Sequence, residues 1–170
     1  MTSLSYGKLS SRQRDELMGE LRGLKRFCLS LAGSEADADD LIQTTVERLL
    51  ERGIPGDAHT ARWAYRVCKN LWIDELRSRE VRSRHANNVM QTGEALELSP
   101  SAEVQSEGER SLAAVNEALR ALPEEQRMAL TLVAVEGKSY AEAAEILEVP
   151  IGTIMSRIAR ARKQLLPVVD

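Results

Sequence analysis

Residues Lys138–Leu166, KSYAEAAEILEVPIGTIMSRIARARKQLL, predict two short helices separated by a tight turn. Ser139 and Glu142 form the pattern Ser-x-x-Glu, a capping box that satisfies two backbone donors at the start of a helix. Pro150 ends this first helix, because the residue before a proline is biased away from helical geometry. Pro150 can also open the next helix, where its missing N–H is not needed.

The second helix of this stretch has two distinct faces. Apolar residues recur at steps of three and four, as expected for a stripe that faces a core: Ile151, Ile154, Ile158, Ala161 and Leu165. Hydroxyl and basic residues occupy the rest: Thr153, Ser156, Arg157, Arg160 and Lys163. No acidic residue lies between positions 150 and 166. Such a helix suits the DNA major groove, where arginine can bind a guanine edge in two places.

A solvated basic face on an ordinary bundle helix is the alternative for this segment. The capping box, the short first helix, the proline turn and the acid-free second helix together favour DNA binding.

The composition predicts an all-α protein. The chain has 170 residues, of which 43% are hydrophobic and only 4% aromatic, with few β-branched runs. The net charge of −3 does not indicate a nucleic-acid partner, but the distribution of charged residues along the chain does. Residues 62–84 carry seven basic and three acidic side chains, a net charge of +4, and an acidic cluster precedes them at Glu35, Asp37, Asp39 and Asp40. Two opposite patches in one half suggest two different partners.

The remaining composition argues against metal, redox and membrane roles. We expect Cys28 and Cys68 to be buried free thiols, with a redox or metal role as the alternative. Neither cysteine has a ligand-like spacing to His59 or His85, so we expect no metal and no cofactor. No apolar run approaches a membrane span and the N-terminus lacks a signal-peptide core, which predicts a cytoplasmic protein without membrane insertion.

Two small helical domains joined by a flexible acidic linker are expected, at residues 1–85, 86–110 and 111–170. In the first domain, periodicity and breakers predict helices over 10–31, 34–52 and 60–83, the last capped by Thr60, with a loop over 53–59. The linker has little periodicity and carries five acids against one arginine between positions 85 and 110. In the second domain, helices over 111–121 and 123–136 precede the pair described above.

The core of the first domain is predicted from its apolar stripes. The first helix should bury Leu17, Leu21, Leu24, Cys28 and Leu31, and the second should bury Leu41, Ile42, Val46, Leu49 and Leu50. In the third helix, Trp63, Val67 and Leu71 are expected in the core, whereas the pattern leaves Tyr65 and Trp72 open between core and surface.

Three segments in order resemble the extracytoplasmic-function (ECF) group of bacterial RNA polymerase sigma factors. These are DADDLIQTTVERLL (37–50), WAYRVCKNLWIDELRSR (63–79) and LRALPEEQRMALTLVAVEGKSYAEAAEILEVPIGTIMSRIARARKQL (119–165). The resemblance implies a sigma-2-like domain, a sigma-4-like helix-turn-helix domain, and a non-catalytic role in promoter recognition at the −35 and −10 elements. It also implies three partners: core RNA polymerase, promoter DNA and an anti-sigma factor.

The first segment resembles the helix with which the family docks on core polymerase. The residues implied in this contact are Asp39, Asp40, Leu41, Gln43 and Thr44. For Glu35 and Asp37, compensation of the helix dipole remains the alternative reading.

The second segment resembles the family's −10 helix. Asn70, Asp74 and Arg77 are spaced so that they share one helix face, from which they can reach bases or sugar-phosphate of an opened strand. The alternative is that Asp74 and Arg77 merely pair along the helix surface. The family also places a pocket for one flipped-out base in the preceding loop, here residues 52–60.

The third segment resembles the −35-binding domain. The resemblance implies base contacts for Arg157, Arg160 and Ser156, and phosphate contacts for Thr153 and Lys163. Two residues depart from the family pattern. Met155 replaces a frequent basic residue, which can alter the −35 preference. Glu148 replaces a frequent turn glycine, at about 1 kcal/mol if its backbone is left-handed.

Three other functions are alternatives to this role. A sigma-like decoy that binds only a regulator is disfavoured by two intact basic faces. A stand-alone repressor would use the C-terminal domain as a dimer. A small helical enzyme would need a cluster of nucleophile, base or metal ligands, which the sequence lacks.

Overall fold

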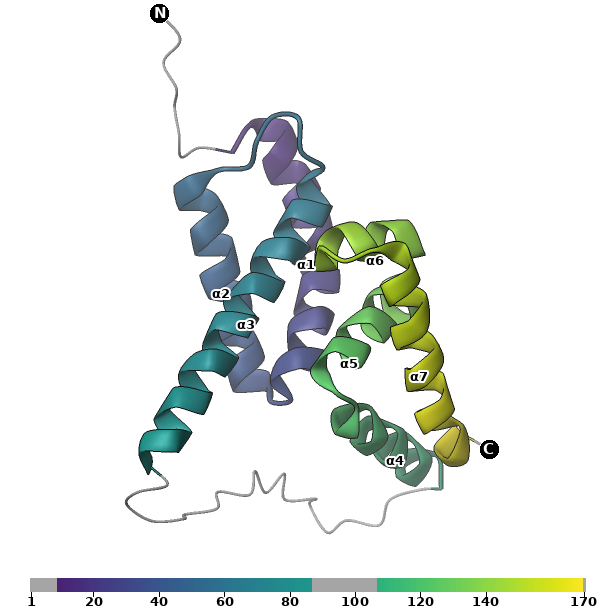
Figure 1. The fold of residues 1–170 in the computed structure, drawn as a ribbon. Coiled ribbons are helices and arrows are strands. Elements are labelled where there is room, and N and C mark those ends of the chain that lie inside the picture. Colours follow the sequence, from purple (N-terminus) through teal and green to yellow (C-terminus); the bar gives the residue numbers. More distant parts are fainter. Residues whose placement is uncertain (1–8, 87–106, 170) are drawn as a thin grey trace, which may run out of the picture.

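The computed structural model describes residues 9–86 and 107–169, so the linker expected at 86–110 lies largely outside the described residues. Within these ranges the chain is helical and contains no strand. Figure 1 shows the elements in order: α1 (Ser11–Ala32), α2 (Glu35–Arg52), α3 (Thr60–Ala86), α4 (Glu107–Ala121), α5 (Glu124–Leu130), the π-helical segment η1 (Thr131–Val135), α6 (Tyr140–Leu147) and α7 (Ile151–Val169). The all-α prediction is confirmed.

Local capping sets the helix ends of the N-terminal half. Ser10 caps α1 in a full capping box, in which its hydroxyl accepts from the Gln13 N–H at 3.1 Å and the Gln13 side chain accepts from the Ser10 N–H at 3.0 Å. Gly33 ends α1 at φ 75°, a left-handed conformation that glycine adopts without strain. Ser34 then caps α2. The boundaries predicted for these two helices are confirmed within one residue.

The start of α3 differs from the prediction. Thr60 is already the first helical residue, and His59 takes the capping role because its backbone oxygen accepts from the Trp63 N–H at 3.0 Å. N-cap preferences favour threonine over histidine, so the predicted cap, Thr60, lies one residue after the observed one. α3 also continues to Ala86, three residues beyond the expected end.

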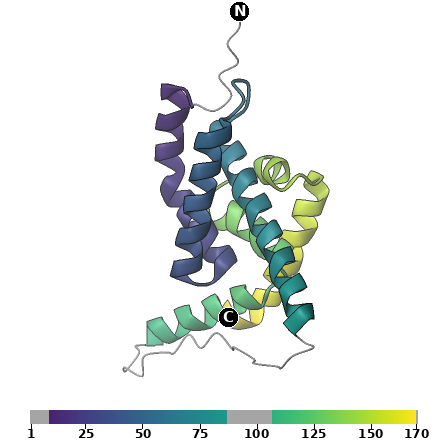
Figure 2. The same ribbon diagram turned by 90° about the vertical axis from the view of Figure 1, so that its left-hand side faces the viewer.

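Helices α1, α2 and α3 pack against one another as a three-helix unit (Figures 1 and 2). Phe27 and Tyr65 are fully buried and meet edge to face, with ring centroids 5.5 Å apart. Tyr65 and Trp72, which the sequence pattern left open, therefore both belong to the core. Cys28 and Cys68 are buried free thiols, as predicted, with their Sγ atoms 3.4 Å apart.

The C-terminal half is built around α7, against which α4, α5 and α6 pack. Its most buried apolar side chains are Leu132, Ile146, Ile154 and Ile158. The prediction was wrong for Ile151, which lies at the first position of α7 and is 49% exposed. α4 begins at Glu107, earlier than the expected residue 111.

The two halves are in direct contact, α3 against α6 and α1 against α5 (Figure 1). The sequence patterns predicted each half but not this packing. None of the helices in the described ranges is long and apolar enough to cross a membrane.

Candidate nucleic-acid interface

The turn between α6 and α7 is held by local backbone geometry. The Ser139 hydroxyl caps α6 by accepting from the Glu142 N–H at 3.1 Å. Glu148 ends α6 with φ 57° and ψ 45°, a left-handed conformation that glycine adopts more easily than glutamate. The N–H of Val149 donates to the Ala144 oxygen at 3.1 Å, which closes the turn before Pro150 starts α7. These contacts fix the direction in which α7 leaves the domain.

α7 runs along the outer edge of the C-terminal half (Figure 1) and presents its polar face to solvent. Ser156, Arg160 and Lys163 are exposed on the face opposite the buried Ile154 and Ile158. These three residues therefore form a continuous accessible strip on α7.

Thr153 and Arg157 lie at the edge of the same face and are only partly exposed. The Arg157 side chain is 20% exposed and lies 3.6 Å from the Glu125 carboxylate. A base contact by Arg157 would therefore first have to loosen this ion pair, whereas Arg160 is accessible.

Two exposed apolar side chains lie at the start of α7, near this strip. Ile151 and Met155 are 49% and 54% exposed, one helical turn apart at the start of α7. Exposed apolar groups at such a position can contact a thymine methyl group. Ile151 continues the core stripe in sequence, so periodicity alone could not identify it as a surface residue.

The C-terminal part of α3 carries the second predicted set. Asn70, Asp74 and Arg77 are all exposed and share one face, as their spacing predicts. In the described part of the chain no ion pair joins Asp74 to Arg77. On this segment Glu75 pairs with Arg79 and Arg82, and Glu80 pairs with Arg84.

A cleft of about 990 Å³ lies between the first half of α1 and the loop before α3. Asp57 and His59 line it from the loop, Thr60 from the start of α3, and Glu16 and Glu20 from α1. A hydrogen bond with Thr60, and then one with Arg12, lowers the pKa of Glu16. Carboxylates in such a cleft can accept hydrogen bonds from exocyclic amino groups of a base.

The predicted polymerase-binding residues lie on α2. Asp39, Asp40, Gln43 and Thr44 are exposed. Leu41 is not, because only 8% of it is accessible and it packs into the core. In this structure Leu41 holds the helix in place, and its contact with polymerase stays a prediction.

A shallow apolar groove of about 450 Å³ lies beside these residues, between α1 and α2. Leu21, Ile42 and Val46 form its floor, and charged side chains rim it, among them Arg22 and Glu47. The sequence pattern placed the three apolar residues in the core, but they are only partly buried. Their helical stripe is wider than the surface that α3 covers.

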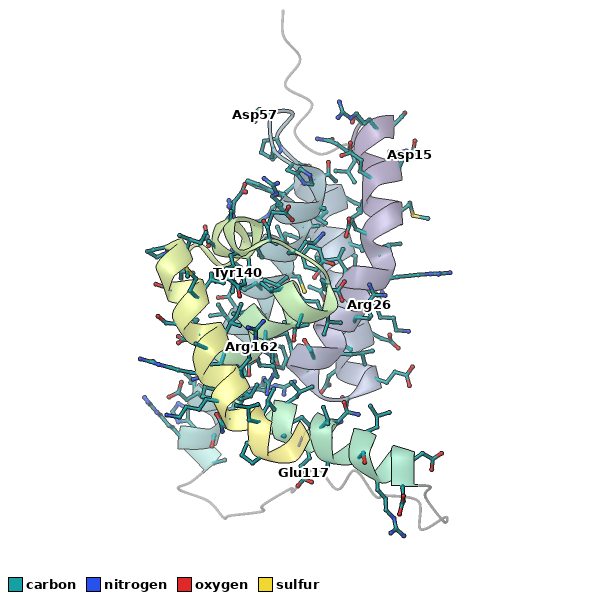
Figure 3. All side chains as sticks on the ribbon, turned by 90° about the vertical axis from the view of Figure 1, so that its right-hand side faces the viewer. Asp15, Arg26, Asp57, Glu117, Tyr140 and Arg162 are labelled. Atoms are coloured by element: carbon teal, nitrogen blue, oxygen red, sulfur yellow. The ribbon has the colours of Figure 1, made fainter. Side chains whose placement is uncertain are left out.

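These surfaces occupy different parts of the molecule. Figure 3 shows Asp57, in the loop that lines the cleft, at one end of the molecule and Arg162, on α7, well away from it. One rigid ligand of small size could not contact all of them, which favours extended macromolecular partners.

Two family models match the chain. Sigma-70 region 2 matches residues 18–82, which cover α2, nearly all of α3 and two thirds of α1. Sigma-70 region 4 matches residues 112–165, which cover the helix-turn-helix. The two models fall on the two halves of the structure.

Curated relatives and a solved structure agree with these matches. The chain is 34% identical over 160 residues to the ECF RNA polymerase sigma factor EcfG of Rhodopseudomonas palustris, covering 92% of this chain and 84% of that protein. It is 35% identical to the ECF RNA polymerase sigma factor SigE of Mycolicibacterium smegmatis, covering 82% of this chain but only 54% of that relative.

The fold is similar to that of the sigma factor RpoE from Bartonella quintana, solved in complex with the anti-sigma factor NepR. The TM-score is 0.73 at 26% identity, and the match covers 94% of this chain and 98% of that one. Together with the relatives and the family models, this likeness shows that the chain belongs to the ECF RNA polymerase sigma factors.

Proposed function

We propose that this sigma factor binds core RNA polymerase through α2 and directs it to promoters through α3 and α7. Asp39, Asp40, Gln43 and Thr44 form the polymerase-binding surface, and the apolar groove floored by Leu21, Ile42 and Val46 extends it. An exposed polar rim beside an apolar groove has the make-up of a protein interface.

In this proposal the two halves of the chain contact different promoter elements. Ser156, Arg157 and Arg160 contact bases of the −35 element, while Thr153 and Lys163 contact phosphate. Asn70, Asp74 and Arg77 contact the −10 element, and the cleft beside Asp57 receives a flipped-out base. Held on one polymerase, two weak modules act at high effective concentration and together specify a promoter.

The division of labour follows the proposed domains, 1–85 for polymerase and the −10 element and 111–170 for the −35 element, with 86–110 between them. The protein acts in the cytoplasm and is not itself an enzyme, since polymerase supplies the chemistry. An anti-sigma factor controls it, by analogy with the complex of Bartonella RpoE and NepR.

One observation carries the proposal most strongly. α7 presents an acid-free strip of Ser156, Arg160 and Lys163 to solvent in a chain whose two halves match sigma-70 regions 2 and 4. Such a strip suits a polyanionic partner, and region 4 of a sigma factor is where such a partner is expected.

Transcription of genomic DNA by purified bacterial core polymerase, in the presence of this chain, tests the proposal. We expect this chain to bind the core enzyme and to produce new transcript starts that share two upstream elements. If it binds the core but yields no new starts, the chain is a sigma-like decoy. If it binds neither core nor promoter, the proposal is wrong.

A further inference from the structure

The contact between α3 and α6 is a row of opposite charges. α3 contributes Arg62, Arg66 and Lys69, which lie on one face at steps of four and three. α6 and its C-cap contribute Glu142, Glu145 and Glu148 at steps of three. We call the first set the α3 cation row and the second the α6 acid row.

The two rows meet along their length. The Arg62 guanidinium lies 2.9 Å from the Glu145 carboxylate and 3.8 Å from that of Glu142. At the other end, Lys69 Nζ lies 2.9 Å from Glu148 Oε2. This contact lowers the pKa of Glu148, so the carboxylate is ionised in the closed arrangement.

The distribution of sign distinguishes this contact from the other edge of the same interface. Where α1 meets the C-terminal half, each side supplies both signs: Arg26 faces Glu136 at 2.9 Å, and Lys138 faces Glu20 at 3.6 Å. Along the α3–α6 edge the N-terminal half supplies only cations and the C-terminal half only acids. Evenly spaced carboxylates on a helix resemble the phosphates of a nucleic-acid strand in charge.

The carboxylates of the α6 acid row do not accept hydrogen bonds from every donor of the α3 cation row. Among the described residues, Arg62 Nε and Arg66 Nε are buried and have no hydrogen-bond acceptor. Arg66 instead donates through Nη2 to the Glu145 backbone oxygen at 2.9 Å, and its Nε is 3.9 Å from the Glu148 carboxylate. A buried guanidinium N–H without an acceptor destabilises the closed interface. Arginine in this position is better suited to an acceptor that can approach in a bidentate geometry.

The α3 cation row also adjoins the proposed −10 surface. At about 100° per residue, Arg62, Arg66 and Lys69 lie roughly a quarter turn around α3 from Asn70, Asp74 and Arg77. If the C-terminal half moved away, the two sets would form one continuous surface along a single helix.

We propose that Arg62, Arg66 and Lys69 form a binding site for nucleic-acid phosphates, which the chain covers with its own Glu142, Glu145 and Glu148 when no DNA is bound. This inference rests on the DNA-binding role proposed above and adds to it a self-masked site. Opening of the halves exchanges three carboxylates for backbone phosphates and extends the −10 surface toward the N-terminus of α3.

Neutralising the acid row tests the proposal directly. The full chain carrying E142Q, E145Q and E148Q is compared with the unmodified chain for binding to a random-sequence DNA duplex of about 30 base pairs, without polymerase. We expect binding at least about tenfold tighter at low salt. The slope of log affinity against log salt should steepen by about two to three, as expected for two to three additional phosphate contacts. Small-angle scattering should show a larger radius of gyration.

The removal of three negative charges alone also favours DNA binding, so a matched control is needed. The variant E35Q/E51Q/E117Q makes the same change in net charge at exposed residues outside the interface. We expect its scattering profile to stay that of the unmodified chain and its affinity to rise much less. Equal gains in the two triple variants would overturn the proposal.

A second pair of variants separates opening from phosphate binding. Adding R62Q, R66Q and K69Q to the acid-row variant should leave the protein open but abolish the gain in affinity and the added salt slope. A gain that persists without the cation row would contradict the assignment, as would an acid-row variant that stays compact. Binding to core polymerase is measured in parallel on the unmodified chain, and its loss would reject the proposed function without bearing on this site.

Discussion

At the scale of single residues, Tyr65 joins the core of the N-terminal half to the other half. Its ring packs against Phe27, and its hydroxyl donates to Glu136 Oε2 at 3.3 Å. Burial, and then the charges of Glu136 and Glu20, raise the pKa of Tyr65 well above the usual value of tyrosine. The folded state therefore strongly disfavours the phenolate.

This raised pKa predicts a loss of stability in alkali. A group whose pKa is raised by folding stabilises the protein below its unfolded pKa, about 10 for tyrosine, and this contribution is lost as the pH rises further. We expect the free energy of unfolding to fall more between about pH 8 and pH 11 in the unmodified chain than in Tyr65→Phe. Denaturant titrations at the two pH values measure this difference. Equal falls in the two proteins would mean that Tyr65 is not shielded as described.

Gly23 of α1 has a packing role that the sequence pattern did not identify. A Cβ atom built there would lie 2.4 Å from the Tyr65 hydroxyl oxygen and 2.7 Å from Glu136 Oε2. Gly19, one turn earlier on α1, would meet nothing within 4 Å. The two glycines therefore form a matched pair in one helix.

We expect opposite results when each of these glycines is replaced by alanine. Gly19→Ala should raise the free energy of unfolding by about 1 kcal/mol, because alanine favours an exposed helix interior. Gly23→Ala should lower it by about 1–2 kcal/mol, since the new methyl group must displace Tyr65 or Glu136. Thermal melts of both variants measure the difference, and a stabilised Gly23→Ala would contradict the packing.

Residue identities explain why some assignments could not be made in advance. Leu41 and Ile42 are adjacent, apolar and on the same stripe, yet the first is buried and the second borders an open groove. Periodicity gives the direction of a side chain but not how far the neighbouring helix covers it. The contacts of Glu136 could not be predicted for a different reason, because its partners Arg26 and Tyr65 lie in the other half.

At the scale of elements, α7 carries the −35 assignment. Arg160 is exposed at the centre of its polar face, whereas Arg157 is held by Glu125. The order of the two arginines as contact residues cannot be read from sequence, because both have the right spacing. The starts of α1 and α2, by contrast, were predicted within one residue, since a helix start depends on residues within one turn.

Replacing Arg160 should weaken promoter use without affecting the polymerase contact. For Arg160→Ala we expect promoter-dependent transcription to fall about tenfold or more, the range for loss of one good base contact of about 1–3 kcal/mol. Binding to core polymerase should be unchanged, because α2 lies in the other half. Arg120→Ala on α4 removes the same charge from another exposed position and serves as control. Equal loss of transcription and polymerase binding in Arg160→Ala would argue against this assignment.

At the scale of the whole molecule, the two halves of the free chain close on each other through charged contacts. The contact of Glu148 with Lys69 lowers the pKa of this carboxyl, so its contribution to closure is present above about pH 4.5 and is lost as the pH falls through the lowered value. We expect the radius of gyration to increase as the pH falls below about 4.5, and to change less in Glu148→Gln. An identical increase in radius of gyration in both proteins would show that Glu148 does not hold the two halves together.

The sequence predicted both halves and their helices, but not that the two halves pack together. Contacts between halves depend on pairs such as Arg62 with Glu145, which are separated by 83 positions and by the linker. No local pattern specifies such pairs, whereas a helix-turn-helix is specified within about 30 residues. The closed arrangement could therefore only come from the structure.

Mapping of DNA proximity in the assembled complex tests the central claim most directly. An iron chelate that cleaves nearby DNA is attached to a cysteine placed at Ser78 on α3 or at Gln164 on α7. Both are exposed positions outside the proposed contact residues, and the native Cys28 and Cys68 are buried. On a promoter bound by the complete polymerase, we expect cleavage near the −10 element from position 78 and near the −35 element from position 164. Cleavage of the same element from both positions, or of neither, would contradict the account.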